Sequence, residues 1–477
     1  MVAVIDNSTF HQLSFLGPHP RVAVAGLGQT GVSVVRYLHR LGVECLVTDS
    51  RHHPPGLAEV EGLDGVSVYT GELRPDVLNW ATHLVVSPGL PLSTPEIRSA
   101  LEHGVALLSD IDLFAGAAQA PVIGITGSNG KSTVTCLVEE MARCAGVEAR
   151  AGGNLGTPAL DLLDPECQLY ILELSSFQLE RTRYLTPLAG AVLNVSPDHL
   201  DRYPDLPTYA TAKFRLLNWS QIRVANLDDP LVRGSLAGNG RSDRMSGISL
   251  LGTGDPRLRD AETVWFSVAT SEARYSLVQR GGQEWLACEG EPLLEAGEVA
   301  LSGRHNLANA LAALALAEAA GIGLEPAVTA LQNFRGLPHR MQVVAQIDGV
   351  SWINDSKGTN VGATEAAITG LEGPLILLAG GDGKGADFTC LRQSVSAKVK
   401  VAILFGRDRQ RLAEALSPVT ETVMAGNLEA AMALARERAS AGDKVLLSPA
   451  CASLDQFENY QVRGERFESL VRRWQSR

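Results

Sequence analysis

Long hydrophobic segments are absent from this 477-residue sequence, although 45% of its residues are hydrophobic. No run of eighteen apolar residues occurs, so we predict no membrane-spanning helix. Residues 1–17 also lack a basic stretch followed by an apolar core, which is the pattern of a secretory signal. These two absences favour a protein that works in the cytoplasm.

Paired cysteines are missing too. The chain has seven cysteines, which is an odd number, and none of them forms a C-x-x-C pair. A disulfide framework or a zinc site is typically built from such pairs, so we expect reduced thiols, as in a cytosolic protein.

Positive charge is in deficit, because the formal net charge is −12. General nucleic-acid binders and proteins of anionic membranes need a basic surface, so we expect no nucleic acid and no membrane as partner. A local basic pocket for a small anion remains compatible with this charge. The length exceeds what one hydrophobic core supports, and it predicts two to four domains.

What the chain does have is a glycine-rich segment at residues 123–133, which contains T-G-S-N-G-K-S-T. It lies between an apolar run that reads as a buried strand and a stretch that reads as a helix. Such a turn directs backbone N–H groups at phosphates. We expect Lys131 to reach the terminal phosphates and Ser132 or Thr133 to ligate Mg²⁺, so a nucleoside triphosphate is the expected ligand. The spacing departs from the common P-loop, which has glycine where this chain has Ile125.

A second glycine motif, G-L-G-x-T-G, places Gly26, Gly28 and Gly31 between a predicted strand and a predicted helix. Asp49 closes the next predicted strand, as in the dinucleotide-binding fingerprint. The motif alone would indicate an NAD enzyme. A UDP-sugar satisfies the same physics, because it also offers a diphosphate and polar groups for the acid. A simple packing turn is a further alternative.

Alternating strands and helices divide the chain into three blocks. Residues 1–109 and 337–477 each read as a Rossmann-like unit, with a parallel sheet covered by helices. Residues 110–336 read as a P-loop ATPase-type α/β domain that carries the glycine-rich segment. Three short strands near residues 263–288 are expected to add antiparallel hairpins to it. The predicted fold class is α/β with three domains.

Polar side chains follow several of the apolar runs. Glu173 ends one run beside the phosphate loop and could ligate Mg²⁺, and a helix cap or a surface carboxylate is equally open. Asp198 and His199 follow another run and could bind metal or phosphate, whereas a lone histidine is usually structural. Asn306 and Asn309 lie one helical turn apart, where they could contact an adenine edge or cap the helix.

Four further polar segments, at residues 338–340, 354–360, 380–384 and 448–457, lie between or after apolar runs. The second of them has more Asp, Ser, Lys and Thr than a turn needs, and the third suits an anion. Lys213 lies in a predicted helix, where the simple interpretation is a solvated helix face.

The motifs T-G-S-N-G-K-S-T, E-L-S-S-F-Q-L, D-H-L-D-R, G-R-H-N-x-x-N, L-P-H-R and N-D-S-K-G-T-N occur in this order. Over nearly its full length the chain therefore resembles the Mur ligases, the ATP-dependent peptide-bond formers of bacterial cell-wall synthesis. G-L-G-x-T-G, G-G-D-G-K and S-P-A-C-A-S-x-D-Q-F are most similar to the branch that adds D-glutamate to UDP-N-acetylmuramoyl-L-alanine. A sibling branch that adds a different amino acid is the alternative.

The resemblance implies a role for individual residues. The UDP-linked substrate would be bound by Gly28, Gln29, Thr30, Asp49, Ser50, Arg51, Gly89, Asn154 and His199. ATP would be bound by Gly127, Asn129, Gly130, Lys131, Ser132, Thr133, Asn306, Asn309, Arg340 and Asp355. D-Glutamate would be bound by Thr359, Lys384, Ser453 and Tyr460, the last at a position where other members carry Phe. The catalytic residues would be Lys131, Glu173, His199, Lys213 and Lys357.

The implied cofactors are ATP and Mg²⁺, with the metal held by Ser132, Glu173, His199 and Lys213. In this family that lysine is carbamylated, which replaces a cation that would repel Mg²⁺ by a carboxylate that binds it. The alanyl carboxylate would attack the γ-phosphate, and the amine of D-glutamate would then attack the acyl phosphate. The resemblance also implies a monomer that acts on small-molecule substrates.

Two other classes of function stay in view. An NAD-dependent oxidoreductase would use the N-terminal glycine motif and leave the phosphate loop unexplained. A non-catalytic regulator would bind ATP without acceptor-dependent turnover. Glutamate addition to folate is disfavoured, because that branch lacks a UDP-binding domain.

Overall fold

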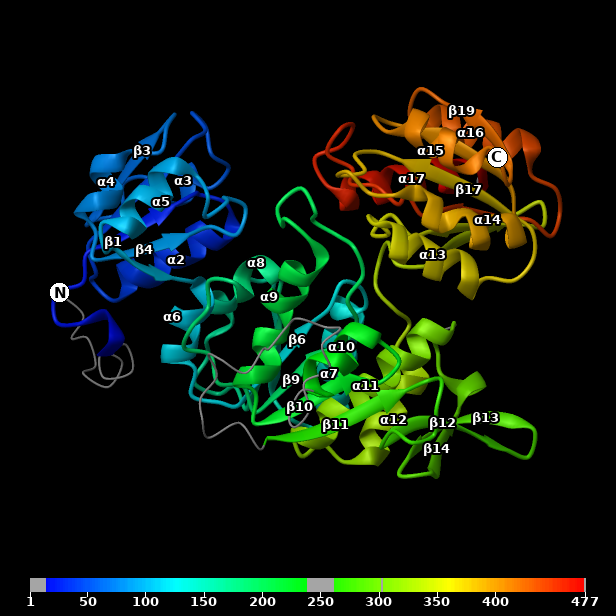
Figure 1. Cartoon of the computed structure of the whole chain (residues 1–477), viewed down its shortest axis with the longest axis horizontal. Coiled ribbons are helices and arrows are strands. Elements are labelled where there is room, and N and C mark those ends of the chain that lie inside the picture. The colour runs from blue at the N-terminus through cyan, green and yellow to red at the C-terminus, as the bar shows by residue number, and fades with distance from the viewer. Residues whose placement is uncertain (1–13, 238–260, 302, 476–477) are drawn as a thin grey trace.

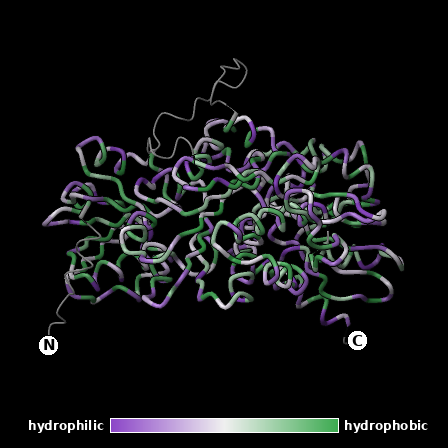
Figure 2. Tube along the Cα trace, turned by 90° about the horizontal axis from the view of Figure 1, so that it is seen from below, coloured by the Kyte–Doolittle hydropathy of each residue, from purple (hydrophilic) through white to green (hydrophobic). Residues whose placement is uncertain are grey.

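The computed structural model describes residues 14–237, 261–301 and 303–475. They form three bodies, each built around its own β-sheet, and the N-terminal and C-terminal bodies lie on either side of the central one (Figure 1). Seen at a right angle, the molecule is elongated, and short hydrophobic stretches alternate with hydrophilic ones along the trace (Figure 2). The predicted α/β fold with three domains is confirmed, while the boundaries after residues 109 and 336 stay predictions. Across the described ranges, the structure has no helix both long and apolar enough to cross a membrane.

The N-terminal sheet has five parallel strands in the order β3-β2-β1-β4-β5. The strands are β1 (Val22–Ala25), β2 (Cys45–Asp49), β3 (Val66–Thr70), β4 (His83–Val86) and β5 (Ala106–Leu108). The helices are α2 (Gln29–Arg40), α3 (Leu57–Val60), α4 (Pro75–Trp80) and α5 (Pro95–Glu102). All four residues of β1 are buried, as expected for a central parallel strand with both faces covered.

The central sheet has nine strands in the order β14-β13-β12-β11-β10-β9-β6-β8-β7. The strands are β6 (Val122–Thr126), β7 (Ala149–Gly153), β8 (Leu169–Glu173), β9 (Ala189–Val192), β10 (Ile222–Asn226), β11 (Glu262–Ser267), β12 (Tyr275–Arg280), β13 (Gln283–Cys288) and β14 (Glu291–Glu295). The helices are α6 (Asp110–Ala117), α7 (Lys131–Cys144), α8 (Ser176–Leu179), α9 (Leu206–Trp219), α10 (Pro230–Ala237), α11 (Arg304–Ala319) and α12 (Leu324–Asn333).

The expected antiparallel hairpins are present only in part. β12 and β13 form one around Gly281 and Gly282, and β14 adds a further antiparallel strand. β11, in contrast, pairs in parallel with both β10 and β12, so its inclusion among the hairpins was wrong. β11 and β12 pair over only two residue pairs, at the end of β11 and the start of β12. The segment between these two parallel strands can therefore be short, because it does not have to run back along the length of β11. Val264 and Phe266 of β11 are buried, which continues the core of the parallel sheet.

The C-terminal sheet has six strands in the order β15-β16-β20-β17-β18-β19, with β15 alone antiparallel to its neighbour. The strands are β15 (Gln342–Ile347), β16 (Val350–Asn354), β17 (Leu375–Gly380), β18 (Val399–Phe405), β19 (Glu421–Met424) and β20 (Lys444–Leu447). The helices are α13 (Val361–Gly370), α14 (Arg392–Lys398), α15 (Arg409–Leu416), α16 (Leu428–Arg438) and α17 (Tyr460–Gln475).

One hydrophobic cluster joins the first two bodies. Val22 and Val24 of β1 belong to the same buried cluster as Tyr170 and Leu172 of β8. The central sheet has a second cluster, which contains α7 and α11. The central sheet therefore has a hydrophobic core on each of its faces. The face that carries Tyr170 and Leu172 shares its core with the N-terminal body.

Candidate active site at the junction of the three bodies

The phosphate loop connects β6 to α7. Gly127 and Gly130 have φ angles of 156° and 85°, which side chains rarely tolerate. A Cβ at Gly130 would lie 2.4 Å from Oδ1 of Asn309, so glycine is required there. Lys131 begins α7, and its Nζ donates to the carbonyl oxygens of Gly127 (2.9 Å) and Ser128 (3.0 Å). Lys131 thus lies folded over the loop.

Asn194 holds this loop in place from the end of β9. Its Oδ1 accepts from the N–H of Asn129 at 2.9 Å, and its Nδ2 donates to the carbonyl of Asn129 at 3.0 Å. The sequence analysis missed this residue. The available signal was a polar side chain directly after a buried strand, the same pattern that marked Glu173.

Glu173 is the carboxylate nearest the loop. It ends β8, whose neighbour in the sheet is β6, and it is 2% exposed. Ser132 donates its hydroxyl to Oε2, and Asn154 donates Nδ2 to Oε1 at 2.6 Å. Burial alone would raise the pKa of Glu173, but the charge of Lys131 and these two hydrogen bonds hold it below its usual value. The side chain is therefore an ionised carboxylate next to the phosphate loop.

Lys213 is buried, so its interpretation as a solvated helix residue was wrong. The fold turns this face of α9 toward the phosphate loop, and Nζ donates to the carbonyl of Gly127 at 2.9 Å. Burial, together with the charge of Lys131, lowers the pKa of Lys213 well below its usual value. The side chain thus favours the neutral amine, which is a nucleophile.

His199 lies beside the same loop and packs against Phe177, with ring centroids 4.8 Å apart. Burial lowers its pKa to about 4, so the imidazole is uncharged at neutral pH and has a lone pair for a metal ion. The neighbouring Asp198 is held ionised: burial would raise its pKa, but the charges of Lys384 and Lys131 and the hydrogen bond from Asn360 lower it. His199 also has a left-handed backbone, with φ of 56°.

The donor set fits a hard cation in part. An ionised carboxylate and a hydroxyl, at Glu173 and Ser132, are oxygen ligands of the type that Mg²⁺ prefers. The neutral imidazole of His199 adds a third candidate. Within the described ranges, the structure has no group of three or more His, Cys, Asp and Glu side chains that could hold a metal. An all-protein cage of the usual ligands is therefore not formed by these residues.

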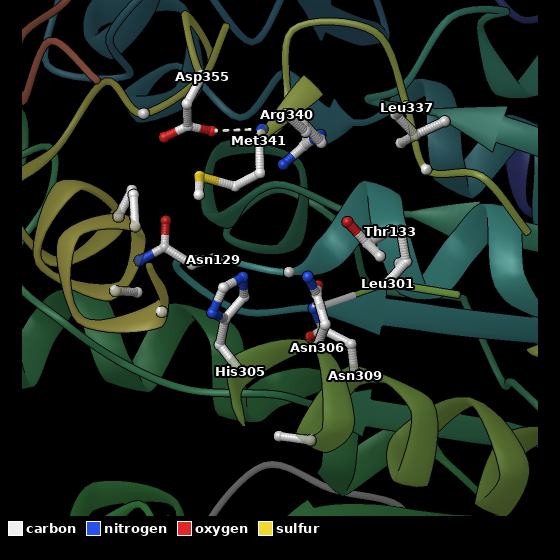
Figure 3. A pocket seen from close by; sticks show the side chains of 18 of the residues that line it. Asn129, Thr133, Leu301, His305, Asn306, Asn309, Leu337, Arg340, Met341 and Asp355 are labelled. Carbon is white, nitrogen blue, oxygen red and sulfur yellow. Dashed lines mark hydrogen bonds between the residues drawn. The ribbon is translucent and has the colours of Figure 1, made fainter. Parts of the chain in front are cut away.

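A cavity of ≈810 Å³ opens between the phosphate loop, the start of α11 and the C-terminal body. Figure 3 shows Thr133, Asn306 and Asn309 on its one side and Asp355 on the other. Asn309 donates Nδ2 to Oδ1 of Asn306 at 3.1 Å, which places both amides on one face of α11 as expected. His305 also lines the cavity, and the sequence analysis gave it no role.

The C-terminal body contributes charged side chains to this cavity. Arg340 donates from Nη2 to Oγ of Ser132 at 2.6 Å. Asp355 accepts from the N–H of Met341 (3.2 Å) and from Oγ of Ser448 (2.8 Å), and burial raises its pKa to about 7. Lys357 has its Nζ 3.9 Å from the centroid of the Tyr460 ring. Burial and the charge of Arg340 lower the pKa of Lys357 to about 7.

Two smaller cavities meet the first one at Lys357. One, of ≈330 Å³, brings together residues of all three bodies, and its lining includes Gln29, Thr30, Ser132, Asn154, Glu173, Lys357 and Tyr460. The other, of ≈240 Å³, is lined by residues that include Asn129, Gly130, Lys131, Asn154, Glu173, His199, Lys213, Arg340, Lys357 and Thr359. Glu173 lines both of these smaller cavities. Most of the residues singled out in the sequence thus gather at one junction.

The remaining residues that the sequence singled out lie outside the lining of these three cavities: Gly28, Asp49, Ser50, Arg51, Gly89, Gly127, Lys384 and Ser453. Asp49 is already engaged, because it accepts from the N–H of Leu27 at 2.7 Å and pairs with Arg51. Lys384 has its Nζ 3.9 Å from Oδ1 of Asp198, which lines the smallest cavity.

Backbone strain gathers near this junction. His339, Met341 and Lys384 have φ angles of 62°, 47° and 48°, in the left-handed region that favours glycine.

Three family profiles match successive parts of the chain. Residues 20–109 match "Mur ligase MurD-like, N-terminal domain", residues 125–317 match "Mur ligase middle domain", and residues 339–451 match "Mur ligase, glutamate ligase domain". A UDP-N-acetylmuramoylalanine--D-glutamate ligase of Methylococcus capsulatus is 51% identical over 453 residues, which cover 95% of this chain and 94% of the relative. The ligase of the same name from Escherichia coli K12 is 45% identical over 454 residues, covering 94% and 98%.

Solved structures of lower identity share the fold. The UDP-N-acetylmuramate-alanine ligase MurC of Thermotoga maritima superposes with a TM-score of 0.59 at 19% identity, covering 96% of this chain and 100% of that one. A pseudomurein peptide ligase type C of Methanothermus fervidus gives 0.59 at 16% identity, covering 95% and 99%. Profiles, close relatives and fold agree over nearly the whole chain, which belongs to the Mur ligase family.

Proposed function

We propose that this protein joins D-glutamate to UDP-N-acetylmuramoyl-L-alanine, with conversion of ATP to ADP and phosphate. The observation that carries the proposal is the identity of 45–51% to D-glutamate ligases of this name, over 94–96% of the chain. The geometry supports the same reaction, because three bodies, each of which would hold one reactant, converge at Glu173 and Lys357.

ATP would bind with its phosphates on the loop at residues 127–133 and its adenosine in the ≈810 Å³ cavity. Backbone N–H groups at the N-terminus of α7 favour the negative charge. Lys131 would leave the carbonyls of the loop and neutralise the terminal phosphates. Asn306 and Asn309 would face the nucleoside, and Arg340 would approach the phosphates from the C-terminal body.

The UDP-linked substrate would lie on the N-terminal body with its diphosphate at the start of α2, near Gly28, Gln29 and Thr30. Its alanyl carboxylate would extend into the ≈330 Å³ cavity, which Gln29 and Thr30 line together with Glu173 and Lys357. This carboxylate attacks the γ-phosphorus, ADP leaves, and an acyl phosphate forms. Lys357 is placed to balance the charge of the transferred phosphate.

D-Glutamate would bind at the C-terminal body, near Thr359, Lys384, Ser453 and Tyr460. Its amine attacks the acyl carbon, the amide bond forms, and phosphate leaves with loss of a proton from the amine. Enclosure between the bodies excludes water from the acyl phosphate, which would otherwise hydrolyse it.

Mg²⁺ would be held by Ser132, Glu173 and His199, and it would supply charge neutralisation to the phosphates when bound. Lys213 fits this role only after modification. A neutral, buried amine can add to CO₂ and lose a proton, which gives a carbamate with oxygen ligands. These residue roles, the monomeric state and the cytoplasmic location stay predictions.

The test is release of phosphate from ATP in the presence of UDP-N-acetylmuramoyl-L-alanine, with D-glutamate, L-glutamate or meso-diaminopimelate as acceptor. We expect release with D-glutamate alone. Release with another amino acid would move the chain to a sibling step of the family, and no release with any acceptor would reject the ligase function. Lys131→Ala is the negative control, because it should fold normally and lose turnover.

A further inference from the structure

The loop that follows β4 forms part of the wall of the substrate cavity. Pro88 lines the ≈330 Å³ cavity together with Gln29 and Thr30 from the start of α2. The loop packs closely on the first glycine motif, because a Cβ at Gly26 would lie 2.8 Å from Cβ of Ser87. Its position therefore decides the shape of the cavity on the side of the N-terminal body.

An arginine of the central body holds this loop. Arg181, which follows α8, is 1% exposed, and its guanidinium crosses to the N-terminal body. Nη1 donates to the carbonyls of Val86 (3.0 Å) and Ser87 (2.6 Å), and Nη2 donates to the carbonyl of Leu90 (2.6 Å). Nη2 and Nε of the same guanidinium also donate to Oε1 of Glu180, at 3.3 Å and 3.4 Å.

A second arginine, Arg202, binds a carbonyl of the same loop that Arg181 does not reach. Arg202 donates from Nη1 to the carbonyl of Gly89 at 3.2 Å, and its guanidinium stacks over Phe177 at 4.6 Å from the ring centroid. Phe177 also packs against His199. The loop is therefore connected to the same group of side chains that surrounds the phosphate site.

The geometry requires arginine at position 181. A buried guanidinium is costly unless its N–H groups are hydrogen-bonded, so the three carbonyls must keep their positions for the side chain to stay buried. The planar fork fixes the directions of these bonds, whereas the ammonium of lysine is a point charge on a flexible stem. The contact thus sets the conformation of the loop and does more than fill space.

We propose that Arg181, assisted by Arg202, is a positioning residue for the nucleotide-linked substrate. It fastens the loop at residues 86–90 to the central body, so that Pro88 is pre-arranged in the wall of the ≈330 Å³ cavity, where the segment between the diphosphate and the alanyl carboxylate would pass. The inference rests on the proposed function for the identity of that substrate. The contacts themselves do not depend on it.

The experiment compares Arg181→Met, Arg181→Lys and Arg202→Met with a matched control, Arg215→Met. Arg215 is a partly buried arginine of the same body, which donates to the carbonyl of Thr182 at 2.8 Å and stacks on Trp219. The KM values for UDP-N-acetylmuramoyl-L-alanine, ATP and D-glutamate are measured separately. Amide hydrogen exchange of the peptide spanning residues 86–92 is followed on the substrate-free proteins.

We expect Arg181→Met to raise the KM for the UDP-linked substrate by roughly tenfold or more, since small misplacements of a bound reactant have large effects. The KM values for ATP and D-glutamate should change less than twofold, and exchange in the loop should become faster. Arg181→Lys keeps the charge but loses the fork, so it should resemble Arg181→Met. Arg202→Met should give a smaller effect in the same direction.

Unchanged exchange and an unchanged KM for the UDP-linked substrate in Arg181→Met would overturn the inference. Equal losses for all three substrates, matched by Arg215→Met, would reduce Arg181 to a structural role. If Arg181→Met does not fold, Arg181→Lys and Arg202→Met decide the question. A wild-type protein without turnover would reject the proposed function, while the exchange data would still decide whether Arg181 orders the loop.

Discussion

Arg340 of the C-terminal body donates a hydrogen bond to the hydroxyl of Ser132 in the phosphate loop, at 2.6 Å. Ser132 in turn donates its hydroxyl to the carboxylate of Glu173. A chain of two hydrogen bonds therefore connects the C-terminal body to the carboxylate of the central sheet. A second contact spans the same boundary, where Asn360 donates Nδ2 to Oδ1 of Asn129 at 3.2 Å.

Arg340→Met should weaken the use of ATP. The guanidinium is the charged group through which the C-terminal body reaches the loop, and loss of a charge-assisted hydrogen bond typically corresponds to about tenfold or more in affinity. We expect the KM for ATP to rise by that factor in steady-state phosphate release. Arg98→Met, on the surface of the N-terminal body, serves as the control. An unchanged KM would show that the contact has no part in nucleotide binding.

Lys213 should make the activity depend on dissolved CO₂. Because burial favours its neutral amine, the side chain can form a carbamate. Turnover should fall several-fold in CO₂-depleted buffer and return on addition of bicarbonate. With ¹³C-bicarbonate, NMR should detect a carbamate signal in the wild type and in Lys444→Ala but not in Lys213→Ala. A carbamate signal that survives Lys213→Ala would assign the modification elsewhere.

Asp355 should make the unliganded protein less stable as the pH rises. Its pKa is about 7 when folded and close to 3.9 when unfolded, so between these values only the folded state keeps the proton. The stabilisation that this proton gives to the folded state is fully present below pH 4. As the pH rises from 4 to 7, it is lost, and the free energy of unfolding falls by at most about 1.4 kcal/mol per pH unit. Asp355→Asn should lack this slope.

The measurement for Asp355 is the pH dependence of thermal unfolding, compared among the wild type, Asp355→Asn and the surface variant Asp161→Asn. The difference between the wild type and Asp355→Asn carries the prediction, because other groups titrate equally in both. Parallel profiles from pH 4 to pH 7 would contradict it.

Substitution by alanine should destabilise the protein at Gly31 but have little effect at Gly28. A Cβ at Gly31 would lie 2.1 Å from the carbonyl oxygen of Gly26, whereas a Cβ at Gly28 would meet nothing within 4 Å. Gly31→Ala should therefore destabilise the N-terminal body by about 1–3 kcal/mol or more, and Gly28→Ala should stay within about 0.5 kcal/mol of the wild type. Calorimetric unfolding of both variants checks this, and equal midpoints would refute the close approach of α2 to β1.

The parts of the fold that local sequence determines could be predicted. β2 ends at Asp49 and β8 ends at Glu173, as predicted, because each strand is a compact apolar run whose end is marked by a polar residue. The phosphate loop was found because its glycines and Lys131 stand close together in the sequence. β7 was missed, because the sequence ARAGG has neither apolar alternation nor β-branched residues, and the strand exists only through its pairing with β8.

Contacts between distant segments left no such signal. Arg340 and Ser132 are 208 residues apart, and neither neighbourhood indicates the other. The burial of Lys213 depends on how α9 packs over the loop, so its helix alone suggested an exposed lysine. Arg181 follows the predicted motif E-L-S-S-F-Q-L, but its partners are backbone carbonyls, which no sequence pattern marks. Family resemblance supplied roles for some of these residues, and geometry supplied the rest.

The left-handed backbone at His199 and Met341 limits which substitutions can make this enzyme more heat-resistant without loss of activity. Each of these residues would be more relaxed as glycine, by about 1 kcal/mol. A laboratory selection for heat resistance alone would therefore accept glycine at these positions and discard side chains that line the cavities at the junction of the three bodies. Selection that scores turnover in every round would keep them, and its heat-resistant variants should carry their changes elsewhere in the chain.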